Sequence, residues 1–186
     1  MHFHDEVPYS FCPLCGGDLE LRSIKASEPD RLVCRRCGFI FYQDPKVAVG
    51  TILQNEESHI LLLRRAIEPG HGKWVFPGGY VDRGEQTVVA AAREAREEAG
   101  LTVRIDRLLN VYSYPGRAPV IIVYVATILG GTLTIDDESS EAKFFAPESI
   151  PWDELAFRST REALTEFLGT ASRSHEPRRH GGHGAI

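Results

Sequence analysis

Long apolar stretches are missing from this 186-residue sequence. No segment approaches the roughly 20 consecutive apolar residues of a membrane-spanning helix, and the first ten residues, MHFHDEVPYS, are too polar for a signal peptide. Excess positive charge is missing as well, because 21 Lys and Arg stand against 26 Asp and Glu, a net charge of −5. These absences argue against a membrane surface or nucleic acid as the main partner. We expect a cytoplasmic protein.

Cysteine is scarce, but its four copies are not scattered. Cys12 and Cys15 form one C-x2-C pair, and Cys34 and Cys37 form another after an interval of eighteen residues. This spacing is typical of a tetrathiolate zinc ribbon. Iron in the same geometry and a pair of disulfides are the alternatives. We predict a structural Zn²⁺ site that is closed to substrate.

The length accommodates one ordinary domain and a small second one. We predict an N-terminal extension over residues 1–8, the ribbon over 9–42, a main domain over 43–169 and a disordered tail over 170–186. The expected strands of the main domain are 47–54, 60–65, 103–114, 120–129 and 143–145, with a turn at 130–131 and a terminal helix at 159–168.

The most informative segment is GYVDRGEQTVVAAAREAREEAGL, residues 79–101. Thr87 is a candidate N-cap, 88–99 is rich in helix formers, and Gly100 can end the helix in the left-handed conformation. On that helix Glu94, Glu97 and Glu98 share one face at positions i, i+3 and i+4. Their mutual repulsion and the unfavourable helix dipole each cost a few tenths of a kcal/mol. A hard divalent cation would offset both.

The alternative is a solvated, charged helix face, which is what most runs of charge are. The residues in front of the helix favour the metal site. Residues 74–85, WVFPGGYVDRGE, read as a strand that runs into a glycine-rich turn. Gly78 and Gly79 allow backbone groups to come close to a ligand or metal. Loop, helix and glutamates together indicate a metal-dependent site for phosphoanhydride chemistry.

The spacing Gly-x5-Glu-x7-Arg-Glu-U-x-Glu-Glu-x-Gly-U, where U is apolar, runs from Gly79 to Leu101 without gaps. It resembles the signature box of the Nudix hydrolases, which cleave nucleoside diphosphates linked to another group X. The resemblance covers residues 46–168. Its one departure is Ala95, at an apolar position that Leu or Ile more often fills. Together with the ribbon, it is similar to the zinc-ribbon subgroup that contains FAD, ADP-ribose and NADH pyrophosphatases. The proline-rich array of the NADH enzymes is replaced here by VYSYPGRAP at 111–119.

The resemblance implies an α+β fold, in which a mixed β-sheet lies between helices as an α/β/α sandwich. It also implies a pyrophosphohydrolase that uses Mg²⁺ or Mn²⁺ on a small-molecule nucleotide, FAD or ADP-ribose first, and releases AMP. The implied metal ligands are Glu94, Glu97, Glu98 and the Gly79 carbonyl. Glu85 is expected to pair with Arg93 and orient the ligand face, or to contact the metal itself. A homodimer is a further expectation, since relatives that hydrolyse ADP-ribose are commonly dimeric.

Five other residues are candidates for the site. Glu141 lies where several family members carry an extra glutamate, and it is either the general base, an additional metal ligand or an ordinary loop acid. Arg64 and Arg65 alternate along a strand, so that one of them can reach a phosphate. Tyr112 and Tyr114 can stack on adenine or flavin, although aromatic residues on strands more often belong to the core.

Four other functions compete with this interpretation. NADH or an oxidised nucleoside triphosphate is an alternative substrate. A nucleotide-sensing regulator on the same fold would usually carry a degraded box, whereas this box is whole. A nucleic-acid adaptor built on the ribbon is disfavoured, because residues 1–42 hold five Lys or Arg against six Asp or Glu.

Overall fold

A computed structural model describes residues 9–174 of the chain, with side chains from 9 to 170. The chain divides into two compact units at Pro45 and Lys46, and each is described by itself. The predicted extension over 1–8 and the tail residues beyond 174 lie outside the described residues. No helix among residues 9–174 is long and apolar enough to cross a membrane.

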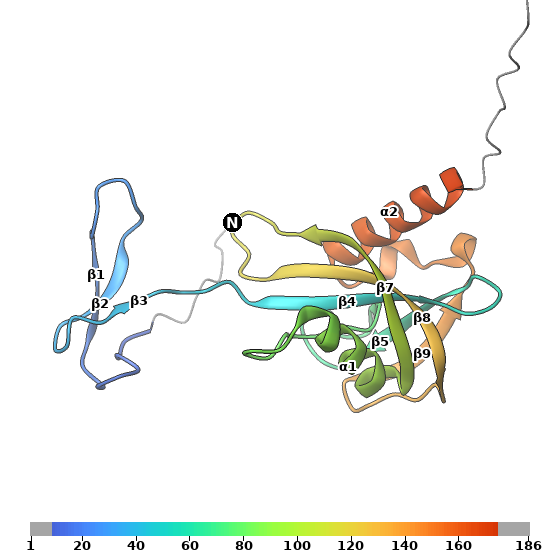
Figure 1. Cartoon of the computed structure of the whole chain (residues 1–186), viewed down its shortest axis with the longest axis horizontal. Coiled ribbons are helices and arrows are strands. Elements are labelled where there is room, and N and C mark those ends of the chain that lie inside the picture. The colour runs from blue at the N-terminus through green and yellow to red at the C-terminus, as the bar shows by residue number, and fades with distance from the viewer. Residues whose placement is uncertain (1–8, 175–186) are drawn as a thin grey trace, which may run out of the picture. The chain divides into compact units, whose positions relative to one another are not determined.

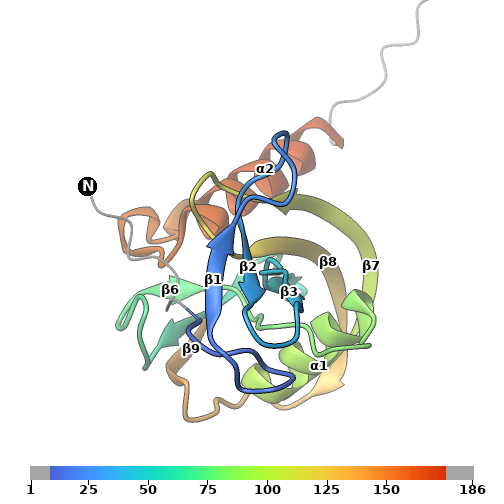
Figure 2. The ribbon, with the colours of Figure 1, turned by 90° about the vertical axis from the view of Figure 1, so that its left-hand side faces the viewer.

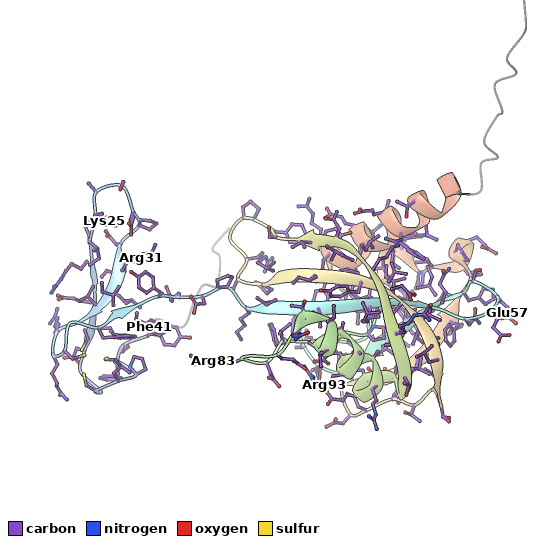
Figure 3. All side chains as sticks on the ribbon, in the orientation of Figure 1. Lys25, Arg31, Phe41, Glu57, Arg83 and Arg93 are labelled. Atoms are coloured by element: carbon purple, nitrogen blue, oxygen red, sulfur yellow. The ribbon has the colours of Figure 1, made fainter. Side chains whose placement is uncertain are left out.

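The first unit is a three-stranded antiparallel ribbon (Figure 1). Its strands are β1 (Leu19–Arg22), β2 (Arg31–Cys34) and β3 (Ile40–Phe41), in the order β1-β2-β3. Its fully buried hydrophobic side chains are few: Cys12, Val33 and Cys34. Figure 3 labels Arg31 and Phe41 on these strands. Because so little apolar surface is buried, metal binding would supply much of the folding free energy of this unit.

The second unit contains a six-stranded mixed sheet. Its strands are β4 (Val47–Gln54), β5 (Ile60–Arg65), β6 (Trp74–Val75), β7 (Leu101–Tyr112), β8 (Val120–Gly131) and β9 (Ser139–Phe145). The order is β6-β5-β4-β8-β7, and β9 pairs with β5. Strands β4 and β8 are parallel along the whole of β4, whereas the other pairs are antiparallel. Strands β4 and β5 pair where Gln54 lies opposite Ile60.

Two helices cover the two faces of the sheet, as Figures 1 and 2 show. Helix α1 (Thr87–Ala99) packs its alanines against Leu53, Leu61 and Leu63 on one face. Helix α2 (Arg158–Ser174) packs Leu164 and Phe167 into a cluster on the other face. Two short 3-10 helices, η1 (Pro147–Ser149) and η2 (Trp152–Glu154), precede α2. The predicted α+β sandwich with a mixed sheet and a preceding ribbon is confirmed.

The expected element bounds differ from the structure in four places. Strand β7 begins and ends two residues earlier than predicted, and the expected turn at Gly130–Gly131 is the end of β8. Strand β9 begins at Ser139 rather than 143, since its first residues pair with Arg64 and Arg65. Helix α2 continues to Ser174, past the predicted end at 168, because an isolated Gly169 costs a helix only about 1 kcal/mol.

Candidate active site

Residues 77–81 form the outer edge of the sheet beside the first half of β4. The Val49 amide donates to the Gly79 carbonyl at 2.8 Å, and the Thr51 amide donates to the Pro77 carbonyl at 2.9 Å. This close approach requires glycine, because a Cβ on Gly78 would lie 2.2 Å from the Val49 carbonyl oxygen. A Cβ on Gly79 would lie 2.6 Å from the Glu94 carboxyl group. The two glycines therefore bring the loop against both β4 and α1.

Helix α1 presents its glutamates to this loop. The helix ends as predicted, with Gly100 at φ 69°. The expected N-cap is wrong: Gln86 occupies that position and Thr87 is the first helical residue. The Thr87 hydroxyl instead shares a hydrogen bond with the Tyr124 hydroxyl at 2.7 Å. A tertiary contact with β8 has thus replaced the local cap that the sequence suggested.

Arg93 is the centre of an ion-pair network. Its guanidinium donates two hydrogen bonds of 2.9 Å to the Glu85 carboxylate, which confirms the predicted pair. It also donates to Glu94 at 2.7 Å and to Glu97 at 2.9 Å, the i, i+4 partner. A fifth hydrogen bond, of 3.1 Å, goes to the Tyr80 carbonyl. The hydrogen bonds that Arg93 donates to Glu85 are the main cause of its raised pKa, so Arg93 stays charged. Figure 3 labels Arg93 on α1.

The carboxyl groups of Glu94 and Glu98 are partly buried, which disfavours their ionised forms. Burial raises the pKa of Glu98 to about 8, although the Gly78 amide donates to its carboxylate at 2.7 Å and opposes the shift. The charges of Glu94, Asp136 and Glu138 raise the pKa of Glu98 further. Burial likewise raises the pKa of Glu94, against the influence of Arg93. Arg93 compensates part of the charge on Glu94, whereas no basic side chain among the described residues opposes the shift at Glu98.

The donor set fits a hard divalent cation. Carboxylate and carbonyl oxygens are the ligands that Mg²⁺ and Mn²⁺ prefer. A cation beside Glu98 would favour the ionised form of this buried carboxyl group. Glu94, Glu98 and the Gly79 carbonyl are the residues that would hold it. Glu97 is oriented by Arg93 and is 57% exposed. Among the described residues the three glutamates are not gathered within 4.8 Å of one another, as the four cysteines are.

Glu141 and the two arginines meet at the end of β5 and β9. Arg64 is the register partner of Glu141, and their side chains approach to 3.8 Å. Arg64 also donates to the Gly72 carbonyl at 2.9 Å, and Arg65 donates to the Pro69 carbonyl at 2.8 Å. Each guanidinium is thereby fixed beside the loop that follows β5. A phosphate contact by either one stays a prediction.

The predicted stacking residues lie on the face of the sheet that α2 covers. Tyr112 is 7% exposed within the core cluster, and its hydroxyl donates to Glu166 at 2.9 Å. Tyr114 donates to Glu162 at 2.7 Å, with Arg158 over its ring. The structure places both tyrosines on the opposite face from α1 and its glutamates. Their role in substrate binding stays a prediction.

Asp136 and Glu138 are the residues that the sequence analysis missed. They precede β9, and their charges act on Glu98. The Asp136 carboxylate accepts a hydrogen bond of 3.1 Å from the Glu138 amide, which holds the two acids together. The only signal in the sequence was the acidic run Asp-Asp-Glu at 136–138, and acidic runs usually belong to solvated loops.

The four cysteines of the ribbon converge as predicted. Their sulfur atoms all lie within 4.8 Å of one another. The Cys12–Cys37 separation is 3.8 Å, and Cys15 lies 3.5 Å from both Cys34 and Cys37. A tetrahedral zinc with bonds of about 2.3 Å needs sulfur separations of about 3.8 Å. The backbone amides of Arg36 and Cys37 also donate to the Cys34 sulfur at 3.4 Å. These four sulfurs fit one structural Zn²⁺.

Comparison with known families and structures gives the same two-part organisation. The family model described as "NUDIX domain" matches residues 44–167, and the model described as "Nudix N-terminal", a zinc ribbon, matches residues 10–43. A crystal structure of a NUDIX hydrolase from Nitrosomonas europaea superposes with a TM-score of 0.83 at 37% identity. That match covers 88% of this chain and 93% of the other.

Two curated relatives carry more specific names. An "ADP-ribose pyrophosphatase" of Methanocaldococcus jannaschii is 39% identical over 120 residues, which cover 62% of this chain and 69% of the relative. A "NAD-capped RNA hydrolase NudC" of Vibrio atlanticus is 27% identical over 142 residues, which cover 76% of this chain. The match spans about half (51%) of that second relative.

Proposed function

This chain belongs to the Nudix hydrolase family, whose members act on phosphoanhydride bonds, and we propose that it hydrolyses ADP-ribose or FAD to release AMP. The observation that supports the proposal is the position of Glu94 and Glu98 beside the Gly78–Gly79 edge, where burial raises the pKa of both carboxyl groups. ADP-ribose is the first substrate to test, because the relative from Methanocaldococcus jannaschii bears that name.

The chemistry divides between a bound cation and the residues around it. A Mg²⁺ or Mn²⁺ ion, when bound, neutralises the diphosphate and lowers the pKa of an attacking water. Glu94, Glu98 and the Gly79 carbonyl hold the ion in this proposal. Arg93 aligns Glu94 and Glu97 by direct hydrogen bonds, and Glu85 fixes the plane of the guanidinium from the other side.

The proton acceptor in this proposal comes from β9 or from the segment that leads into it. Glu141 keeps the role proposed from the sequence, as the base or as an additional ligand. Its side chain is 47% exposed and has Arg64 as its neighbour. Glu138, whose charge contributes to the raised pKa of Glu98, is the alternative proton acceptor in this proposal. Glu138→Gln and Glu141→Gln variants separate the two: the base variant lowers kcat and removes the acidic limb of the pH–rate profile.

A product assay tests the function. The protein is incubated with ADP-ribose, FAD, NADH or an oxidised dGTP in Mg²⁺ or Mn²⁺, and the products are resolved by chromatography. We expect AMP from ADP-ribose or FAD, and loss of that AMP in Glu98→Gln. Glu57→Gln is the matched control, since Glu57 lies in the exposed β4–β5 turn (Figure 3). Turnover of the oxidised dGTP alone would replace the proposal with nucleotide-pool sanitation.

A further inference from the structure

One aromatic side chain beside the candidate active site has no role in the mechanism above. Tyr80 follows Gly79 directly, and its side chain is 53% exposed. Its carbonyl accepts a hydrogen bond from Arg93, while the neighbouring Gly78 amide donates to Glu98. Arg93 and Glu98 therefore contact the backbone edge of residues 77–81 that faces away from β4. In the described chain no strand pairs with the far side of that edge.

The Tyr80 ring lies on the other face of the sheet from the glutamates. Tyr80 lies opposite Ala48. Ala48 lies opposite Ile121 on β8, and Ile121 lies opposite Tyr112 on β7. Directly opposed residues in neighbouring strands share a face. Tyr112 and Ile121 belong to the cluster under α2, so Tyr80 projects to that side. Side chains alternate along the edge, and Gly79 faces Glu94 on the α1 side instead.

Ala48 and Ile121 form a shallow apolar surface next to the ring. Both side chains are half-buried, whereas Tyr80 is exposed. Neighbouring strands lie about 4.8 Å apart, so this surface is about 10 Å wide from Tyr80 to Ile121. A nucleobase has a matching width, and its flat face can pack against a tyrosine ring.

A cation completes the arrangement. The Lys46 ammonium lies 4.9 Å from the centre of the Tyr80 ring, where the ring quadrupole attracts it. Lys46 is exposed, and within the described part of the chain it forms no ion pair with a carboxylate. The ring limits the conformations of this long side chain, which lowers the entropy cost of binding an anion. An ammonium group in this position suits a phosphate oxygen.

We propose that Tyr80 and Lys46 form a nucleotide-binding pair at the same edge of the sheet as the metal site but on its opposite face, with the nucleobase against the Tyr80 ring over Ala48 and Ile121, and a phosphate on Lys46. The inference rests on the proposed function, since a nucleotide substrate brings a base and a phosphate to this edge together. It assigns base stacking to Tyr80 in place of Tyr112 and Tyr114. Their hydroxyls are already bound by Glu166 and Glu162.

Equilibrium binding of two ligands tests the pair. AMP carries a base and a phosphate, whereas ribose 5-phosphate carries the phosphate without the base, and calorimetry in Mg²⁺ measures both without turnover. We expect Tyr80→Leu to weaken AMP binding about tenfold and to change ribose 5-phosphate binding less than twofold. Tyr80→Phe keeps the ring and should bind AMP like wild type. Lys46→Met should weaken both ligands several-fold.

Matched controls separate stacking from general damage. Tyr42 is 56% exposed and also has a cation over its ring, Arg31 at 5.3 Å, but it lies in the ribbon unit. Tyr42→Leu should leave both affinities unchanged. Lys143, 5.1 Å from the Phe145 ring, provides the same control for Lys46 as Lys143→Met.

Three results would overturn the pair. The first is an equal loss of affinity for AMP and ribose 5-phosphate in Tyr80→Leu. The second is unchanged AMP affinity in that variant, and the third is no AMP binding by wild type. Failure of the proposed function gives a different result, since the wild type would then bind AMP through Tyr80 yet release no AMP from ADP-ribose or FAD. The thermal midpoint of each variant, within a few degrees of wild type, confirms that it is folded.

Discussion

Replacing Glu98 by Gln should remove the loss of stability that this carboxyl group causes as pH rises in the absence of a catalytic metal. The folded-state pKa of Glu98 is raised to about 8, from an ordinary value of 4.5, because the carboxylate is buried. Between these two values the folded state binds the proton and the unfolded state releases it. The free energy of unfolding of the wild type therefore falls as pH rises through this window. Below pH 4.5 both states are protonated, and the destabilisation is absent.

The size of the effect follows from the shift. Each pKa unit corresponds to 1.36 kcal/mol, so a shift of roughly 3.5 units gives at most about 5 kcal/mol, fully developed above pH 8. Glutamine keeps the shape and the acceptor for the Gly78 amide, but it cannot ionise. The difference in unfolding free energy between Glu98→Gln and wild type should grow by about 3 to 4 kcal/mol from pH 5 to pH 8.

Urea unfolding at pH 5, 6, 7 and 8 measures this difference. Both proteins are kept in zinc-containing, Mg²⁺-free buffer, so that the ribbon stays intact while the catalytic site is empty of Mg²⁺. Glu57→Gln, in the exposed turn, should run parallel to wild type at every pH. A constant difference between Glu98→Gln and wild type across the four pH values would refute the charge assignment. Adding Mg²⁺ at pH 8 should stabilise the wild type more than the variant.

The remaining predictions concern the network, the loop and the ribbon. Arg93→Lys should lower kcat for ADP-ribose about 10- to 100-fold with little change in KM. Lysine cannot make the two hydrogen bonds that Arg93 donates to Glu85. An unchanged kcat would show that the network is dispensable. Gly79→Ala should abolish turnover while the protein stays folded by circular dichroism, because the new methyl group would displace the Glu94 carboxylate; activity within twofold of wild type would contradict the close approach. Cys34→Ser should reduce bound zinc, measured by atomic absorption, from one ion per chain to less than half of one, and retention of a full equivalent would exclude the four-sulfur site.

The features that the sequence predicted correctly depend on residues that are close together in the chain or belong to one motif. The bounds of β4 and β5 and the helical end at Gly100 agree with prediction, because they depend on short-range apolar patterns and on a glycine in the left-handed conformation. The Arg93–Glu97 pair follows from helical spacing alone. The four cysteines also converge as their spacing predicts. In each case the partners are close in sequence or belong to a motif that permits one geometry.

Tertiary packing decided the features that depend on segments far apart in the chain. The sequence could not show that Glu98 is buried beside Gly78, or that Asp136 and Glu138 act on it. Thr87 lost its expected capping role to a contact with Tyr124, thirty-seven positions away. The sequence could not show, for the same reason, that Tyr80 is exposed while Tyr112 is buried. Strand alternation gives two faces, but only the packing of α1 and α2 determines which face holds the glutamates and which rings remain exposed.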